Sequence, residues 1–307
     1  MSRYIQKRVL LVLPTVLLTS LVVFLMLYLI PGDPASIYLG ENKATPERIA
    51  QIRHSLGLDR PLYVQYGDFL WKALRGDLGR SVQTNRPVAQ EIGDRLPKTL
   101  QLAVAAMLLA TVFGVTLGVV CGLKQNTWID TVAMLFALVG VSMPVFWLGL
   151  LLIMFFAVRL GWLPATSNDG VRGLILPAVS LALLSTATLA RLVRSSIIEV
   201  LHQEFLTTTR AKGLHERVVV LRHALPNALI PVITVIGLQF GSLLSGAVIT
   251  ETVFARPGLG KLVVDSIQNK DFPVVQGVIL VLASTYVIIN LLVDLSYAVI
   301  DPRVRLQ

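Results

Sequence analysis

The chain has 307 residues, of which 54% are hydrophobic and only 15% are charged, and its net charge is +9. In a soluble domain this charge would suggest nucleic-acid binding, but the apolar content excludes an ordinary soluble domain and indicates an integral membrane protein. The single cysteine, Cys121, excludes an intrachain disulfide.

Six stretches lack charged residues for long enough to cross a hydrocarbon core of about 30 Å, which takes about 20 helical residues. They are residues 9–30, 99–123, 131–158, 173–190, 228–250 and 272–293. The first stretch is too long for the apolar part of a signal peptide, so we expect an uncleaved helix. The third is long enough to contain more than the span alone.

The basic residues predict the orientation of these spans. With six spans, the N-terminus, the loop at Lys124, residues 191–227 and the tail share one side, which holds most of the Lys and Arg of the short loops. Cytoplasmic loops carry such an excess, so both termini and residues 191–227 are predicted to be cytoplasmic. Residues 31–98 are also basic, but long translocated loops are weak topology signals.

The long loop after the first span is predicted to be helical. A helix start at Thr45-Pro46-Glu47 precedes apolar residues at helical spacing, and Gly57 ends the pattern. A second helix begins near Pro61 and ends before Gly76, and a third, around residues 88–96, leads into the next span. The residues favour a packed external cap, and a lip that meets substrate or a delivery protein is the alternative.

Small residues recur at four-residue intervals within two spans. They are Gly114, Gly118 and Gly122 in the second span, and Gly237, Gly241 and Ser245 in the fifth. Such stripes let helix backbones approach closely in a membrane, so we expect them to be packing surfaces. Prolines, among them Pro144 in the third span, can kink the helices that contain them.

Several motifs of energy conversion and catalysis are missing from the sequence. No predicted span has an ionisable residue near its middle, which disfavours ion-coupled transport. The sequence also lacks a P-loop, an H-E-x-x-H motif, a G-x-S-x-G motif and a Cys/His cluster. We therefore expect no catalytic residue, metal site or cofactor on this chain, and an energy source elsewhere.

A polar helical hairpin is predicted at about residues 195–226. Its first helix shows apolar residues at spacings of three and four through Leu201, Phe205 and Leu206. Gly213 ends this helix, and a second helix runs to Pro226, which opens the fifth span. An ordinary connection would be a few residues long, so a docking surface is favoured over a solvated loop.

This hairpin resembles a motif of the membrane subunits of binding-protein-dependent ABC importers. That motif reads E-A-A, three residues, G, nine residues, I-x-L-P, and here Gly213 and Leu225-Pro226 occupy the glycine and the final pair. Thr207-Thr208-Thr209 replace the first three positions, and His223 replaces the isoleucine. The segments 210–213 and 222–227 are similar to the variant found in the dipeptide, oligopeptide and nickel branch.

Further short motifs extend the resemblance to the first permease subunit of that branch. They are Pro31-Gly-Asp-Pro34, the segment 56–61, Gly76-Asp-Leu-Gly79, Ser142-Met-Pro144, Pro257-Gly-Leu-Gly260 and Asp301-Pro-Arg303. Each string is short, but their order and spacing together are specific.

The resemblance implies an all-α membrane protein with the six transmembrane helices of the type I ABC importer (MetI-like) fold and a helical external segment after helix 1. Residues 1–98 would form the first helix and the external segment, residues 99–300 the five-helix permease core, and residues 301–307 a cytoplasmic tail. The setting would be a bacterial inner membrane.

The resemblance also implies partners: a second, homologous permease subunit, two ATPase subunits that bind ATP and Mg, and an external substrate-binding protein. The coupling helix that docks on an ATPase subunit would comprise Glu204, Phe205, Leu206, Thr207, Thr208, Thr209, Arg210, Ala211, Lys212 and Gly213, with Leu225 and Pro226 at the end of the motif. Arg210 and Lys212 would be candidate contacts to the partner.

The function implied is import of di- or oligopeptides or of peptide-like solutes. Nickel, metal-chelate or glutathione import by the same mechanism is an alternative, and a stand-alone secondary carrier or channel is an alternative of another class. Polar candidates for the lining of the path are Ser142, Ser180, Ser185, Thr186, Gln239 and Asn290. Hydroxyl groups can also bond back to their own helix, so these residues are open to a purely structural interpretation.

Overall fold

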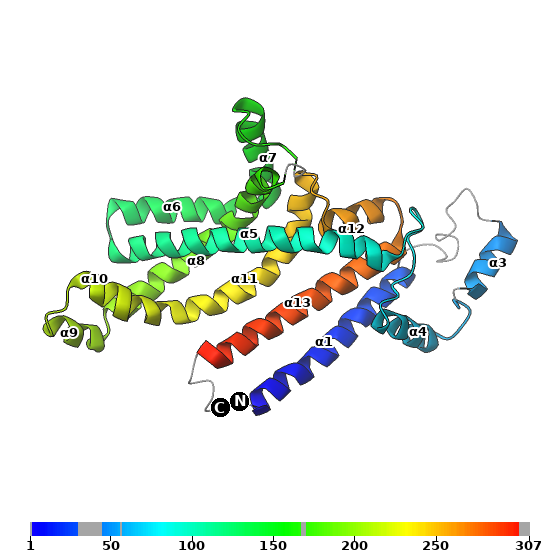
Figure 1. Ribbon diagram of the computed structural model, residues 1–307, viewed down its shortest axis with the longest axis horizontal. Coiled ribbons are helices and arrows are strands. Elements are labelled where there is room, and N and C mark those ends of the chain that lie inside the picture. Colours follow the sequence, from blue (N-terminus) through cyan, green and yellow to red (C-terminus); the bar gives the residue numbers. More distant parts are fainter. Residues whose placement is uncertain (1, 30–44, 56, 167–169, 301–307) are drawn as a thin grey trace. The chain divides into compact units, whose positions relative to one another are not determined.

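A computed structural model describes residues 2–29, 45–55, 57–166 and 170–300 of the chain, and these are almost entirely helical (Figure 1). In this described part, the β-structure consists of one isolated bridge between Arg80 and Pro87. The motif at Pro31–Pro34 and the tail at 301–307 lie outside the described residues.

The helices follow the predicted spans in chain order. They are α1 (Ser2–Leu29), α3 (Pro46–Ser55), α4 (Leu62–Leu74), α5 (Val88–Leu123), α6 (Trp128–Ser142), α7 (Val145–Leu152), the π-helical turn η2 (Ile153–Arg159), α8 (Arg172–Leu201), α9 (Glu204–Ala211), α10 (Glu216–Val218), the π-helical turn η3 (Val219–Ala224), α11 (Leu225–Val253), α12 (Leu259–Gln268) and α13 (Phe272–Ile300). Among the described residues, five helices are long and apolar enough to cross a membrane, and the bent pair α6 and α7–η2 would make a sixth span.

The chain divides into two compact units. Among the described residues, the core unit contains Thr99–Arg256 together with residues 292–300, and the N-terminal unit contains residues of Ser2–Lys98 together with Pro257–Leu291. The boundary after Lys98 coincides with one boundary predicted from the sequence, whereas α12 and most of α13 group with the N-terminal part. The functional division at residues 98 and 300 stays a prediction.

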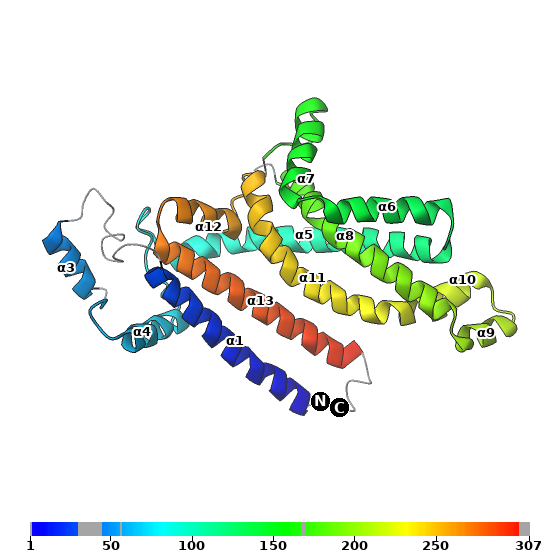
Figure 2. The ribbon, with the colours of Figure 1, turned by 180° about the vertical axis from the view of Figure 1, so that it is seen from behind.

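Helix α8 lies at the centre of the core unit. It packs against α6, α7 and α11, and Figure 2 shows it between α6 and α11. Its buried side chains Leu189, Val193 and Ile197 join those of α11 in one apolar cluster. Through these contacts α8 is the neighbour that the other helices of the unit share.

The glycine stripe of α5 packs directly on α8, as predicted. A Cβ atom added at Gly118 would lie 2.6 Å from the carbonyl oxygen of Ala190 and 2.6 Å from Cβ of Val193. Gly114 and Gly122 meet Leu189 and Ile197 in the same way, at 2.8 and 2.7 Å. Only a hydrogen atom fits at these positions, so the two backbones approach more closely than any larger residue would allow.

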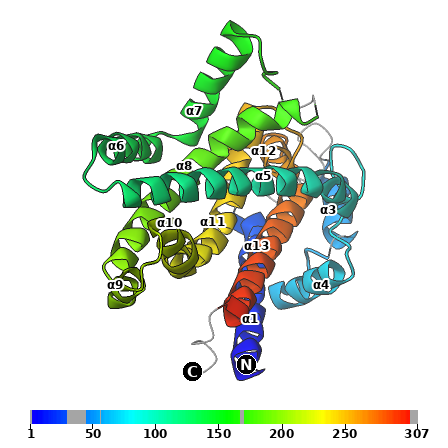
Figure 3. The same ribbon diagram turned by 60° about the vertical axis from the view of Figure 1, so that its left-hand side comes forward.

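The third predicted span, 131–158, is broken next to Pro144, the proline at which the sequence allowed a kink. Helix α6 ends at Ser142 and α7 begins at Val145, and the two helices are bent by 107°. Pro144 has no backbone N–H to continue the helix and forces Met143 out of the helical region, to φ −81° and ψ 128°. Figure 3 shows α7 leaving the direction of α6.

The predicted external helices are present in the N-terminal unit. Helices α3 and α4 have the predicted positions, and Gly57 takes the positive φ of +68° that suits the end of α3. The third predicted helix, at 88–96, is the first part of α5 and continues without interruption into the second span.

We predict that Gly118→Ala lowers the stability of the protein by about 1–3 kcal/mol, because the added methyl group would overlap α8. The measurement is the Tm of the purified transporter in detergent. Gly93→Ala is the matched control on the same helix, since nothing lies within 4 Å of its added Cβ. Alanine is favoured over glycine within a helix by about 0.5–1 kcal/mol, so the Tm of this control should be equal or higher. An unchanged Tm for Gly118→Ala would contradict the close approach.

Candidate functional site

The predicted hairpin is formed by the end of α8, by α9, and by α10 with η3. Helix α8 continues past the predicted span to Leu201, and α9 begins three residues later at Glu204. Leu206 is fully buried and belongs to the same apolar cluster as Ile197 and Val219. Its side chain therefore holds α9 on the core unit, whereas Phe205 next to it is 39% exposed.

Gly213 has the backbone conformation that the sequence motif predicts. Its φ of +76° lies in the left-handed region, and nothing lies within 4 Å of a Cβ atom added there. Its N–H donates to the carbonyl oxygen of Arg210 at 2.9 Å, which closes the last turn of α9. The position therefore favours glycine because of backbone strain and not because of crowding.

Arg210 is paired within the hairpin. Its guanidinium donates to both carboxylate oxygens of Glu216 at 2.9 and 3.2 Å, and this hydrogen-bonded partner raises the pKa of Arg210. The pair joins α9 to α10 across the turn at Gly213. Lys212 is exposed and makes no ion pair within the described residues. Arg210 is therefore paired inside the hairpin and Lys212 is not, although both were candidate contacts to the partner.

The exposed surface of α9 is polar except for Phe205 and Ala211. Glu204, Thr207 and Thr208 are exposed along it, and Thr209 is half-buried. The hydroxyl groups of Thr208 and Thr209 donate to the carbonyl oxygens of Glu204 and Phe205, at 3.3 and 2.7 Å. Ala211, at the end of α9, is also exposed. The structure thus presents every candidate docking residue from Glu204 to Gly213 at the surface or half-buried, except Leu206.

The hairpin is joined to the fifth span without a loop. Leu225 and Pro226 lie in the first turn of α11, as predicted, and η3 connects α10 directly to this helix. Pro226 lacks an N–H, and the first turn of a helix tolerates this loss. The helical run from Glu216 to Val253 is therefore continuous, so its two ends are parts of one element.

An ion pair that sequence reasoning missed ties α6 to α8. The guanidinium of Arg194 donates to the two carboxylate oxygens of Asp130 at 2.6 and 2.7 Å, and the Asp130 side chain is buried. The N–H of Asn126 also donates to this carboxylate, at 3.1 Å. Two parallel hydrogen bonds fix direction as well as distance. The one sequence signal for this pair was Asp130 itself, a carboxylate directly before the predicted span at 131–158.

The predicted path residues do not form one cluster. The Ser185 hydroxyl reaches the side-chain oxygen of Gln239 at 3.5 Å, which links α8 to α11. Ser142 and Thr186 instead bond back to carbonyl oxygens of their own helices, at 3.0 and 2.9 Å. The structure therefore brings together only Ser185 and Gln239 as a polar pair between two spans.

Two further path candidates have other surroundings. Ser180 is buried and donates to the carbonyl oxygen of Val145 at 3.2 Å, so it supports the bend before α7. Asn290 belongs to the N-terminal unit, and its Oδ1 is buried without a hydrogen-bond partner among the described residues. A buried amide oxygen of this kind loses the stabilisation of its hydrogen bonds to water.

A buried polar cluster lies at the other end of α11 from the hairpin. Glu251 is fully buried and accepts a hydrogen bond from the Thr99 hydroxyl at 2.7 Å. Arg256, also buried, donates to the side chain of Gln101 at 2.9 Å. Sequence reasoning ended the fifth span at residue 250 and so left Glu251 outside it. The cluster links α11 to α5 at this end of the core unit.

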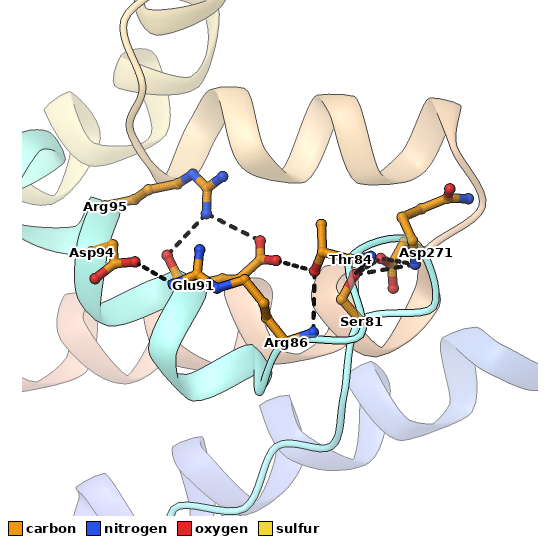
Figure 4. Close-up of polar contacts among 8 residues, drawn as sticks. Ser81, Thr84, Arg86, Glu91, Asp94, Arg95 and Asp271 are labelled. Atoms are coloured by element: carbon orange, nitrogen blue, oxygen red, sulfur yellow. Dashed lines mark hydrogen bonds and ion pairs between the residues drawn. The ribbon is translucent and has the colours of Figure 1, made fainter.

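A second polar network, in the N-terminal unit, fixes the loop that precedes α5. The Asp271 carboxylate is buried and accepts from the Ser81 hydroxyl and from the N–H groups of Val82 and Gln83 (Figure 4). In the same network Glu91 is bound by the Thr84 hydroxyl and by Arg95, and Arg86 pairs with Asp94 at 2.8 Å. The loop is thus packed in the way expected of a cap, and contact with substrate stays untested.

Comparisons with solved structures agree with the architecture. A chain of the MetNI methionine ABC transporter in an inward-facing conformation has a TM-score of 0.59 and 20% identity, covering 68% of this chain and 96% of that chain. An amino acid ABC transporter with histidines has a TM-score of 0.53 and 19% identity, covering 70% and 94%. At these identities the likeness concerns the fold, and it confirms the predicted MetI-like arrangement.

Two permeases are similar over the whole chain. The dipeptide transport system permease protein DppB of Alkalihalophilus pseudofirmus is 43% identical, with 99% of this chain and 100% of that protein covered. The glutathione transport system permease protein GsiC of Escherichia coli (strain K12) is 44% identical, with 99% of each covered.

Family matches cover nearly all of the sequence. Residues 1–103 match the N-terminal part of the binding-protein-dependent transport system membrane component, and residues 114–306 match the binding-protein-dependent transport system inner membrane component. This family makes the chain a multi-span permease of a bacterial ABC importer, whose ATPase activity lies in partner subunits. The chain therefore belongs to the family of binding-protein-dependent transport system inner membrane components.

Proposed function

We propose that this permease imports di- or oligopeptides or peptide-like solutes, a class that includes glutathione. The observation that carries the proposal is full-length identity of 43% to a dipeptide permease and of 44% to a glutathione permease. The two relatives favour a peptide backbone as the shared feature of the cargo, ahead of a nickel or metal chelate. Cargo selection would rest with the external binding protein.

The assembly that we propose has four membrane-associated subunits and one external protein. This chain would pair with a second, homologous permease, and two ATPase subunits would bind ATP and Mg. An external binding protein would deliver the solute. Both termini and the α9 hairpin would lie in the cytoplasm, which the excess of Lys and Arg on that side supports.

The hairpin would receive the movement of an ATPase subunit. Helix α9 is joined to α8 on one side and, through Gly213, α10 and η3, to α11 on the other. Leu206 and Val219 are buried in the cluster shared by α8 and α11, so a displacement of α9 would move both helices together. The Arg194–Asp130 pair would carry this movement to α6. Packed helices move as rigid bodies between a few arrangements, which suits alternating access.

The path would have a neutral lining in the core unit. The Ser185–Gln239 pair lies between α8 and α11, which are the two helices joined by the hairpin. Uncharged hydrogen-bonding groups can contact peptide amides and carbonyls without holding them tightly. A joint displacement of α8 and α11 would move this pair with them.

We predict that the assembled transporter, in proteoliposomes with its binding protein and internal ATP, takes up labelled dipeptide or glutathione. Uptake should stop without ATP and should be reduced by unlabelled peptides. Uptake of a nickel chelate with no competition by peptides would contradict the proposed cargo. ATP-independent flux through the purified chain alone would indicate the channel or secondary-carrier alternative.

We predict that Gly213→Val uncouples ATP hydrolysis from transport and leaves membrane insertion intact. A β-branched residue at φ +76° is strained by about 1–2 kcal/mol, so the turn between α9 and α10 would change its conformation. Gly213→Asn is the matched control, because asparagine tolerates this region. The ratio of solute imported to ATP hydrolysed should fall several-fold for Gly213→Val and only slightly for Gly213→Asn, and equal ratios would exclude a role of this turn in coupling.

We predict that Arg210 acts within the hairpin and that Lys212 contacts the partner subunit. The exchange Arg210→Glu with Glu216→Arg keeps the ion pair and should retain most uptake, whereas Arg210→Glu alone places two carboxylates together and should impair it. Lys212→Glu should weaken recovery of the ATPase subunit with the chain in detergent, and Lys124→Glu, in another loop on the same predicted side, is its control. Loss of uptake in the exchanged pair equal to that of Arg210→Glu would show that Arg210 itself touches the partner.

A further inference from the structure

Helix α4 of the N-terminal unit packs along α1. The Tyr66 hydroxyl donates to the carbonyl oxygen of Leu17 at 3.0 Å and lies 2.9 Å from the Ser20 hydroxyl. One helical turn or more further along α1, the Phe24 ring lies 5.5 Å from that of Tyr66 and 5.9 Å from that of Phe69. Helix α4 is therefore fixed to α1 at several successive turns.

These contacts lie within the apolar span of α1, which is Leu10–Leu29. Leu17 is twelve residues before Leu29, and a helix rises 1.5 Å per residue, so the Tyr66 hydroxyl lies roughly 18 Å below that end of the span. A hydrocarbon core is about 30 Å thick. The side of α4 that faces α1 is thus level with the interior of a bilayer, although the sequence assigns α4 to an external segment.

The polar groups on this side of α4 are satisfied by the protein. The side chain of Gln65 is buried, accepts from the Tyr28 hydroxyl and donates to the carbonyl oxygen of Arg60 at 2.8 Å. Tyr66 bonds to α1 as described. At the depth of the hydrocarbon core no water is available to replace such partners, so this pairing is what a membrane setting demands.

A second face of α4 is apolar and exposed. Tyr63, Trp71 and Leu74 are 77%, 57% and 81% exposed, and their spacing of eight and three residues places them on one side of the helix together with Gly67 and Leu70. A large exposed apolar face on a helix beside a membrane span has lipid as its natural neighbour. Trp and Tyr are the aromatic residues enriched where lipid meets water.

Asp68 and Lys72, the charged residues of α4, lie on another side of the helix, and Arg75, directly after α4, stacks on a member of the apolar face. Asp68 pairs with Arg60 at 3.3 Å, and the Arg75 guanidinium lies over the Trp71 ring at 4.4 Å from its centre. Asp68 and Lys72 line a cavity of about 240 Å³ whose other walls include α1, the loop at residues 77–82 and the start of α13. The charges can therefore reach polar surroundings while the apolar face contacts lipid.

We propose that α4 is inserted in the membrane beside α1, with the Tyr63–Trp71–Leu74 face in contact with the acyl chains and interfacial region of the leaflet at the Leu29 end of α1. The inference rests on the membrane location of the chain and is independent of the cargo. The occupant of this face is lipid, and the binding protein or a second subunit is the alternative that the experiment excludes.

The test is fluorescence quenching of Trp71 in the assembled transporter with its binding protein in nanodiscs, with Trp128, Trp147, Trp162 and the tryptophans of the partner proteins replaced by phenylalanine. Lipids brominated on the acyl chains should quench Trp71 several-fold more than they quench a control tryptophan placed by Gln51→Trp on the polar helix α3. Aqueous acrylamide should show the reverse order. The control variant also carries Trp71→Phe, so that it contains a single tryptophan.

Quenching of Trp71 by acrylamide to the same extent as the α3 control would overturn the proposal. Protection from both quenchers would also overturn it, because the face would then be covered by protein. A second measurement uses the assembled transporter in nanodiscs and a membrane-impermeant maleimide, with Cys121→Ala as background. Leu74→Cys should react several-fold more slowly than Gln51→Cys, and equal rates would contradict insertion.

Discussion

The core unit depends on the close contact between the glycine stripe of α5 and the middle of α8. Cβ atoms at Gly114, Gly118 and Gly122 would lie within 2.8 Å of α8, so the two backbones touch with only hydrogen atoms between them. In a membrane, helices gain little from hiding apolar surface from lipid, and such packing is the main source of their association. This contact positions α8, and the functional groups of the unit are arranged along it.

Helix α8 unites elements that would otherwise be separate. It carries Ser180 at the bend before α7, Ser185 at the polar pair with Gln239, and Arg194 at the ion pair with Asp130. It then continues into the hairpin at Leu201. In the proposed coupling, energy from an ATPase subunit would enter the chain at this hairpin and pass along α8. The fixed partners of α8 would suit the transfer that we propose.

The sequence predicted the elements better than the contacts between them. Apolar stretches predicted the spans, and Pro46, Gly57 and Gly213 predicted helix ends, because these signals act within a few residues. Pro144 indicated a possible kink, but its size of 107° was not predicted, since a run of apolar residues reads the same whether it is straight or sharply bent. The Asp130–Arg194 pair joins residues 64 positions apart, and nothing local predicts such a partner. The burial of Leu206 beside the exposed Phe205 is likewise a tertiary property.

The π-helical turn η3 sets which side of the hairpin faces the interior. The buried residues Val219, Ala224, Ala228 and Val232 follow one another at intervals of five, four and four. An α-helix returns to the same side after about four residues, whereas a π-helical turn needs one more. Without that extra residue the inward position after Val219 would be His223, an imidazole in an apolar cluster. The wide turn thus acts as a register correction, which lets a polar segment and an apolar span share one unbroken helix.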